Sequence, residues 1–300
     1  MGEIKRIIAA TDMSRLASFA EARAAMLAHE LGAESLDLLH IVDNLSLEAL
    51  RQLAQAPEDA DHRLLESSRN QLTEIEKRLA ERYGITITTT ALNVGRTHTE
   101  ILRYAKLLNA GLVVMGVHGG GFVRKLFVGS TVDKVLRTLA CPVLVVKREP
   151  ETPYQRVLVP VDFSEPSRLG MDIALTIAPR ASITVLHAFE VPFEANFNFS
   201  DEQIQAYRAE QRAEKSDELK KFLSDFKSSA APSPAVEFGP ASTVIQEQIE
   251  VFEPDLIVIG KHGKSGWENM LLGSVTKQVM QYADCDVLVV GQGQQEEAPR

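Results

Sequence analysis

The sequence predicts an α/β protein of two tandem domains, each a doubly wound, open, parallel five-stranded sheet with helices on both faces. A chain of 300 residues is long enough for two domains of about 150, each with its own core. Short apolar runs alternate with longer amphipathic stretches, and the whole alternation occurs twice. Because the apolar runs do not alternate in polarity, they are typical of strands buried on both faces, as a parallel sheet requires.

The two halves align segment by segment, which identifies an internal repeat. The matched segments are Lys5–Ser14 with Gln155–Ser164, Leu38–His40 with Val185–His187, and Gly95–Cys141 with Gly239–Cys285. We therefore expect one domain at residues 1–147 and another at 154–291. A charged, proline-bearing linker is expected at 148–153 and a polar, disordered tail at 292–300.

Each element of the first half is predicted from its own stretch of sequence. Continuous apolar runs predict strands at residues 7–10, 36–42, 85–92, 112–115 and 143–146. The amphipathic stretches between them predict helices at 14–31, about 46–82, 97–109 and 130–139. The second half repeats this order. Strands connected through helices in this way lie parallel, so their carboxyl ends meet at one edge of the sheet.

Composition and charge exclude several classes of partner. With a net charge of −9 and a pI near 5.4, the chain offers no basic footprint for nucleic acid or an anionic membrane surface. No apolar run approaches the roughly 20 residues of a membrane-spanning helix. The N-terminus enters a strand directly, so we expect a cytoplasmic protein. Cys141 and Cys285 occupy equivalent positions, which favours two free buried thiols over a disulfide.

The candidate site follows the fourth strand of each half, where a glycine-rich loop leads into a helix. In doubly wound sheets, ligands bind outside the carboxyl ends of the strands, where the strand order reverses. We expect the loop glycines to allow positive φ, and the serines to cap helices whose N-termini attract phosphate. The residues are Gly116, His118, Gly119, Gly129 and Ser130 in the first half, and Gly260, His262, Gly263, Gly273 and Ser274 in the second.

The glycine motif alone also fits a purely structural role. A glycine turn and a serine cap could simply connect this strand to this helix, because short glycine motifs are weak signals. The identical nine-residue gap before each Gly-Ser pair favours function, although a duplication also preserves spacing. Gly263-Lys264-Ser265 does not complete a P-loop, because the first glycine of that motif would fall on Val258.

Two further pairs of residues stand at strand ends on the same edge. Asp12 and Asp162 could accept hydrogen bonds from ribose hydroxyls, or each could form an Asx turn before a serine-capped helix. His40 and His187 end the second strand, and the next backbone position, Ile41 or Ala188, could meet the edge of adenine. A core-facing or capping role is the more common one for such histidines.

The loop spacing, the segments Thr-Asp-Met-Ser and Val-Asp-Phe-Ser, and the closing Cys-Pro-Val-Leu-Val-Val together resemble the universal stress protein family. The resemblance covers nearly the whole chain, once per half. It implies a tandem, Rossmann-like protein that binds ATP, alone or with Mg²⁺, and whose last strands, at 143–146 and 287–290, pair within one chain or in a homodimer. The implied ligand contacts are Asp12, Ile41, Gly116, His118, Gly119, Gly129 and Ser130, then Asp162, Ala188, Gly260, His262, Gly263, Gly273 and Ser274.

The leading functional hypothesis is a stress-responsive regulator that responds to bound ATP or another adenine nucleotide. Hydrolysis needs a base for water and a held metal ion, and no acidic pair accompanies the loop, so we expect slow turnover at most. The alternative is an interaction protein that works without nucleotide and whose crevices are empty or hold another ligand. An ATP-using, adenylyl-transferring enzyme is a third and lower-ranked hypothesis.

Overall fold

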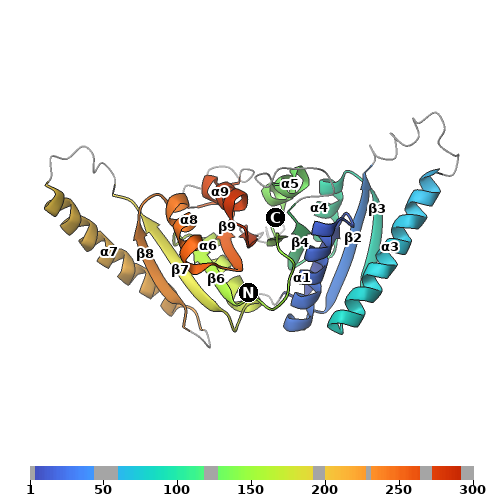
Figure 1. The fold of residues 1–300 in the computed structure, drawn as a ribbon, viewed down its shortest axis with the longest axis horizontal. Coiled ribbons are helices and arrows are strands. Elements are labelled where there is room, and N and C mark those ends of the chain that lie inside the picture. The colour runs from blue at the N-terminus through green and yellow to red at the C-terminus, as the bar shows by residue number, and fades with distance from the viewer. Residues whose placement is uncertain are drawn as a thin grey trace, which may run out of the picture. The chain divides into compact units, whose positions relative to one another are not determined.

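The computed structural model describes residues 4–43, 60–117, 128–191, 200–227, 231–263 and 272–291. The chain divides into two compact units between Pro153 and Tyr154. We call the N-terminal one the first unit and the C-terminal one the second unit. Each unit contains an open sheet of parallel strands with helices against it (Figure 1).

The first unit has the strand order β3-β2-β1-β4-β5, and its neighbouring strands all run parallel. Its strands are β1 (Arg6–Thr11), β2 (Ser35–Asp43), β3 (Thr89–Gly95), β4 (Leu112–Gly116) and β5 (Val143–Val146). Its helices are α1 (Arg15–Leu31), α3 (Ala60–Tyr83), α4 (Thr97–Leu107) and α5 (Ser130–Thr138). The chain moves from β1 outward to β3 and then crosses back to β4. With right-handed crossovers, this reversal puts α1 and α3 on one face and α4 and α5 on the other.

The second unit repeats the arrangement with the order β10-β9-β6-β7-β8. Its strands are β6 (Arg156–Pro160), β7 (Ser182–Phe189), β8 (Ser233–Phe238), β9 (Leu256–Gly260) and β10 (Asp286–Val290). Its helices are α6 (Glu165–Ile177), α7 (Asp201–Ser224), α8 (Ala241–Phe252) and α9 (Ser274–Tyr282). The predicted class, a tandem pair of doubly wound, open, parallel α/β sheets, is confirmed.

The central strands are apolar on both faces, as the continuous runs predicted. Ile7 and Ile8 are neighbours on β1, so they face opposite sides of the sheet, and both are fully buried. Val157 and Leu158 on β6 are fully buried in the same way. Each sheet is therefore the middle layer of a three-layer unit, and only its strand ends are left to build a site.

The third strand differs from its predicted position at 85–92, because β3 begins at Thr89 and continues to Gly95. The register explains the difference. Thr89 pairs with Asp37, only two residues after β2 begins at Ser35, so residues 85 and 86 lie beyond the end of their single neighbour. At the other end β2 continues to Asp43, which pairs with Gly95 and extends β3. The helix predicted at about 46–82 corresponds to α3, and residues 44–59 lie outside the described part of the chain.

Two other expectations concern membranes and thiols. Over the described ranges, every helix is too short or too polar to cross a bilayer. Both cysteines are free thiols, with Cys285 buried and Cys141 partly buried. Burial raises the pKa of the Cys141 thiol to about 12, so this thiol is protonated and unreactive near neutral pH.

Candidate functional site

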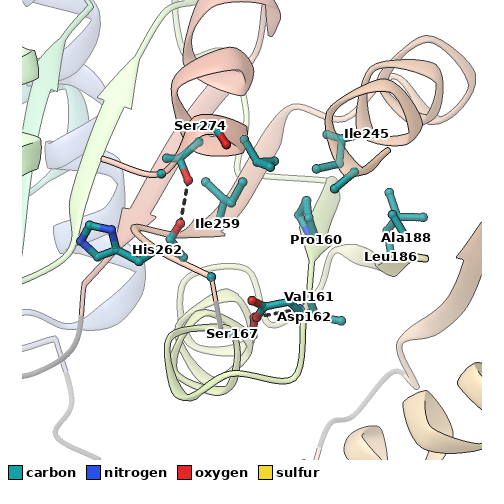
Figure 2. Close-up of a pocket in the computed structure, with 16 residues that line it drawn as sticks. Pro160, Val161, Asp162, Ser167, Leu186, Ala188, Ile245, Ile259, His262 and Ser274 are labelled. Carbon is teal, nitrogen blue, oxygen red and sulfur yellow. Dashed lines mark hydrogen bonds between the residues drawn. The ribbon is translucent and has the colours of Figure 1, made fainter. Parts of the chain in front are cut away.

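A cavity of about 210 Å³ lies in the second unit at the carboxyl ends of β6 and β9 (Figure 2). In the strand order, β6 lies between β9 and β7, so the cavity is at the point where the direction of strand progression reverses. All seven residues that the sequence placed in a second-half site line this cavity. They are Asp162, Ala188, Gly260, His262, Gly263, Gly273 and Ser274.

The Asp162 carboxylate is fixed by the turn that connects β6 to α6. Its Oδ1 accepts hydrogen bonds from the Ser164 backbone N–H at 3.1 Å, the Ser164 hydroxyl at 2.5 Å and the Ser167 hydroxyl at 2.7 Å. Ser164 also caps α6 by accepting from the Ser167 N–H. Phe163, between Asp162 and Ser164, is in the left-handed region at φ 62°. The Asx-turn interpretation is therefore correct for Oδ1, and it holds the carboxylate in one orientation.

The loop after β9 passes directly over this carboxylate. A Cβ atom built on Gly263 would lie 2.8 Å from Asp162 Oδ2, closer than real Cβ contacts allow. The second carboxylate oxygen therefore faces the loop that opens from the glycine-ended strand. Any side chain at position 263 would have to displace the carboxylate.

The prediction that Ser130 and Ser274 are helix N-caps is wrong. Gly129 and Gly273 are the N-caps, and neither helix has a side-chain cap. The Gly273 N–H donates to the Lys261 carbonyl at 2.9 Å while its own carbonyl accepts from the Lys277 N–H at 3.0 Å, so Ser274 is the first residue of α9. The first-turn N–H groups of α9 have no intrahelical acceptor, and their residues Ser274, Val275 and Thr276 line the cavity.

The expectation of positive φ at the loop glycines is also wrong for those that the structure describes. The described glycines with positive φ are Gly32, Gly84 and Gly239. Gly116 and Gly260 are required instead by close packing. A Cβ on Gly116 would lie 3.0 Å from the Leu16 carbonyl oxygen, and one on Gly260 would lie 3.0 Å from Pro166 Cβ. Each strand end therefore packs against the first turn of the helix that follows the unit's first strand.

The remaining wall of the cavity is apolar. Pro160 and Leu186 are paired across β6 and β7, and Ala188 follows two residues later on the same face. Ile245 from α8 and Ile259 from β9 complete this wall (Figure 2). The sequence did not predict Pro160, Leu186 and the two isoleucines as site residues, because they meet only through the strand register and the packing of α8. The cavity thus has an apolar side and a polar side.

The two strand-two histidines support the backbone and lie within their strands, which continue to Asp43 and Phe189. The prediction that they end the strand is wrong. His187 Nδ1 donates to the Val161 carbonyl at 2.9 Å, and His40 Nδ1 makes the same bond to Thr11 at 2.8 Å. Each histidine therefore ties its strand to the residue just before the site aspartate, which is the capping role.

The loop histidine His262 is a cavity residue with a lowered pKa. Burial is the main cause, because it disfavours the charged ring, and the neighbouring Lys261 cation lowers the pKa further. The imidazole is therefore neutral at physiological pH. It can donate or accept a hydrogen bond there, and a bound anion would favour its protonation.

In the first unit, the corresponding residues lie at the corresponding strand ends. Asp12 follows β1 and accepts a hydrogen bond from the Ser14 N–H at 3.0 Å, which repeats the Asx turn. Ile41 lies on β2, Gly116 ends β4, and Gly129 and Ser130 begin α5. His118 and Gly119 lie outside the described residues.

The fold and the strand-end site define a class of protein with two tandem, doubly wound α/β units. Where the strand order reverses, each unit has a carboxylate, a strand that ends in a closely packed glycine, and a helix N-terminus. Within that class, this chain belongs to the universal stress protein family, which matches it twice, over residues 3–147 and 153–291.

Three relatives illustrate the similarity. A universal stress protein of Mycobacterium tuberculosis is 28% identical over 192 residues, which are 61% of this chain and 62% of that protein, so the match leaves over a third of the relative's length unmatched. The crystal structure of a universal stress protein from Archaeoglobus fulgidus is 19% identical, covers 97% of this chain and 100% of its own, and has a TM-score of 0.67. A universal stress protein solved in complex with cAMP is 21% identical, covers 50% of this chain and 100% of its own, and has a TM-score of 0.38.

Proposed function

We propose that this protein is a stress-responsive regulator that binds an adenine nucleotide, ATP in the first instance, at the strand-end site of each unit. The observation that carries the proposal is the composition of the second unit's cavity. A fixed carboxylate, a helix N-terminus and an apolar wall converge on one space. Ribose, phosphates and a purine base need these three surfaces.

The phosphates would bind at the start of α9. The N–H groups of Ser274, Val275 and Thr276 lack intrahelical acceptors, and the helix dipole adds partial positive charge at the same place. The Thr276 hydroxyl donates to the Gly260 carbonyl at 2.8 Å, which fixes this helix turn to the end of β9. This hydrogen bond would preorganise the helix turn at which the anion binds.

The ribose and the base would occupy the other two surfaces. Asp162 has one oxygen held by its own turn and the other turned toward the loop, and a carboxylate accepts hydrogen bonds from vicinal hydroxyls. Leu186, Ala188 and Ile245 provide an apolar surface on which a purine ring can be buried. Discrimination among bases would come from the backbone beside Ala188.

The proposal is of binding and regulation rather than rapid turnover. Among the described residues that line the cavity, Asp162 is the one carboxylate, and three donors already hold its Oδ1. A carboxylate fixed in this way positions a ligand, and it is poorly placed to move and activate water. We expect slow ATP hydrolysis at most.

The test combines released-ligand analysis with calorimetry. The purified chain is denatured and its small molecules identified, and nucleotide-free protein is then titrated with ATP. We expect co-purified adenine nucleotide and up to two binding events per chain, one of which is weakened in Asp162→Ala. Nucleotide-free protein that gives no heat with ATP would overturn the proposal and favour an interaction protein that works without nucleotide.

Two expectations from the sequence remain predictions. The pairing of residues 143–146 with 287–290 within one chain predicts that a truncated first half dimerises or aggregates at high concentration, as exposed strand edges do. A cytoplasmic location would be tested by cell fractionation.

A further inference from the structure

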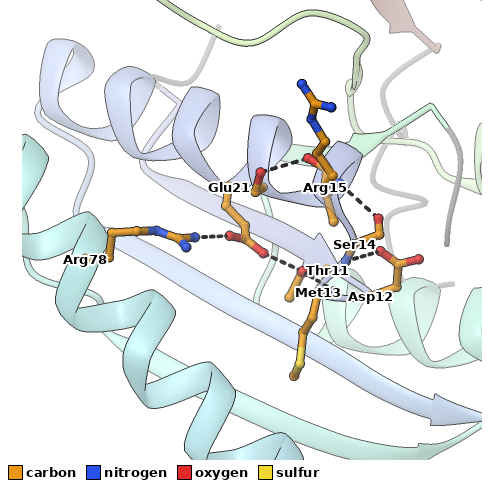
Figure 3. A network of polar contacts seen from close by, with 9 residues as sticks. Thr11, Asp12, Met13, Ser14, Arg15, Glu21 and Arg78 are labelled. Carbon is orange, nitrogen blue, oxygen red and sulfur yellow. Dashed lines mark hydrogen bonds and ion pairs between the residues drawn. The ribbon is translucent and has the colours of Figure 1, made fainter.

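A buried carboxylate lies beneath the aspartate turn of the first unit. Glu21 is on α1, and only 1% of its side chain is exposed. Its Oε1 accepts a hydrogen bond from the Thr11 hydroxyl at 2.5 Å, and its Oε2 accepts from Arg78 Nη2 at 2.9 Å (Figure 3). Three elements, β1, α1 and α3, therefore meet at one carboxyl group.

The Thr11 hydroxyl connects this carboxyl group to the turn that carries Asp12. While it donates to Glu21, its oxygen accepts a hydrogen bond from the Met13 N–H at 2.9 Å. Met13 has φ 62°, a left-handed conformation that is uncommon for residues other than glycine, asparagine and aspartate. The next N–H, that of Ser14, donates to Asp12 Oδ1. Hydrogen bonds thus connect α3 to the Met13 N–H, and one peptide unit of backbone connects that N–H to the Ser14 N–H, which bonds to the carboxylate of the candidate site.

The second unit fixes its aspartate by other means. Ser167 donates to Asp162 Oδ1, whereas the equivalent residue of the first unit, Ala17, has no hydroxyl to offer. Val161 and Met171 stand at the positions of Thr11 and Glu21, and both are apolar and buried. The first unit therefore lacks the serine that bonds to the site aspartate, and it has the polar pair Thr11 and Glu21 where the second unit has apolar residues.

Stability alone gives no reason to place a carboxylate here. Burying a charge costs more free energy than a partly exposed partner returns, and 56% of the Arg78 side chain is exposed. Burial raises the pKa of Glu21, and the nearby Asp12 carboxylate raises it further, despite the opposing effects of Thr11 and Arg78. A group kept at such a cost, in contact with the site's own turn, is better explained by what it positions.

We propose that Glu21 and Thr11 are positioning residues of the first nucleotide site: they hold the Met13 turn so that Asp12 meets the ribose, and Arg78 couples that turn to α3. The inference rests on the proposed function, because it assigns a task to Asp12. It makes the first site dependent on two polar residues whose equivalents in the second unit, Val161 and Met171, are apolar.

The test uses the full-length chain with the second site weakened by Asp162→Ala, so that calorimetry reports ATP binding to the first unit. Thr11→Val removes the hydroxyl while keeping the shape and copies Val161, and Thr11→Ser keeps the hydroxyl. We expect Thr11→Val and Glu21→Gln to weaken ATP binding about tenfold, as loss of one charge-assisted hydrogen bond would. Thr11→Ser should stay within about twofold of the parent.

A double-mutant cycle separates positioning from a general loss of structure. In an Asp12→Ala background, Thr11→Val and Glu21→Gln should have no further effect on ATP affinity. The ratio of affinities for ATP and 2′,3′-dideoxy-ATP should fall in Thr11→Val to the value in Asp12→Ala, because the ribose hydroxyls lose their acceptor in both. A merely destabilised protein would keep the ratio.

The outcomes distinguish the two proposals. Absence of ATP binding to the parent chain overturns the proposed function and this inference together. ATP binding that depends on Asp12 but is unchanged by Thr11→Val and Glu21→Gln overturns this inference alone. Equal losses with and without Asp12 would also overturn it.

Discussion

The two units build the same turn on different chemistry. Met13 and Phe163 both adopt φ 62°, and each is followed by a serine whose N–H donates to the site aspartate. Beneath Met13 lies the charged network of Glu21, whereas Phe163 packs against the His187 ring at 4.3 Å between centroids and against Phe222 at 5.7 Å. Since the supports differ and the turn does not, the turn geometry is the property that both units preserve.

The largest effect is expected where the backbone itself leaves no room. Gly116→Ala should lower the free energy of unfolding by about 1–3 kcal/mol, because overpacking at a rigid contact has that cost. The added methyl group would meet three backbone atoms of Leu16 and Ala17 within 3.3 Å. Gly260→Ala should cost less, since its methyl group would meet two atoms within 3.3 Å, Pro166 Cβ and the His262 carbonyl oxygen, rather than three. Chemical denaturation of each variant measures the two losses, and a larger loss at Gly260 would contradict the comparison.

Removing the charge of each aspartate should weaken ATP binding in its own unit and should change the stability of the fold by different amounts. Asp162→Asn and Asp12→Asn should each reduce affinity roughly tenfold, about 1.4 kcal/mol. Asp162→Asn should also destabilise the fold, because Ser164 and Ser167 bond to a charged acceptor. Asp12→Asn should destabilise it less, because the loss of a charged acceptor for the Ser14 N–H is offset by relief of the repulsion between Asp12 and the buried Glu21 carboxylate. Calorimetry and thermal unfolding of the pair provide the readouts, and equal stability changes would refute the asymmetry.

The buried carboxyl group of the first unit predicts a pH dependence that the second unit lacks. Because the pKa of Glu21 is raised in the folded state, the folded chain takes up its proton first as the pH falls. The stability that Glu21 contributes is fully present below the unfolded value of 4.5 and is lost as the pH rises through the folded pKa. Relative to the parent, Glu21→Gln should therefore stabilise the protein more at pH 7 than at pH 4.5, as measured by denaturation across that range.

A control for this pH effect has the opposite sign. Glu34 is exposed and pairs with Lys5 at 2.9 Å, and hydrogen bonding to that lysine lowers its pKa. Its contribution is present above 4.5 and is lost on acidification, so Glu34→Gln should show the reverse trend. Glu21 also lines a surface groove together with Arg78 and two other charged residues of α3, Glu74 and Lys77, and Asp12 lies close enough to act on its charge. Identical trends for the two glutamine variants would contradict the assignment to Glu21.

The smallest effect concerns a helix position where the units differ by one methyl group. Gly170 of α6 corresponds to Ala20 of α1, and a Cβ there would lie 3.6 Å from Val258, an ordinary contact distance. Gly170→Ala should raise the free energy of unfolding by about 0.4–1 kcal/mol, since it restricts the unfolded chain without strain. A destabilised variant would show that the second unit is packed more tightly here than the first.

The sequence was sufficient for the fold because its signals are local and repeated. Apolar runs such as 143–146 predicted strand β5 at its observed bounds, and the glycine spacing led to residues that line one cavity. The sequence predicted three features wrongly: the bounds of the edge strand β3, the helix caps at Gly129 and Gly273, and the φ values of the loop glycines. Each of these depends on where a neighbouring element ends or packs, which no local pattern records.

Glu21 was missed although a signal was available. It lies four residues after Ala17 and three before Ala24, on the stripe of α1 that faces the sheet. A glutamate on an apolar stripe predicts a buried charge, and a buried charge predicts a partner. The partner itself, Arg78, could not be predicted, because α3 reaches α1 only through the folded arrangement of the sheet.

Because the residues beneath Met13 differ from those beneath Phe163, the nucleotide affinity of each unit can change independently. A change in the charged network alters one turn, and a change in the aromatic cluster alters the other, so substitutions can shift one affinity while leaving its twin untouched. Under the proposed function, two nucleotide sites of different affinity on one chain would fill at different nucleotide concentrations. A single chain would then respond over a wider range of nucleotide concentrations than two sites of equal affinity could.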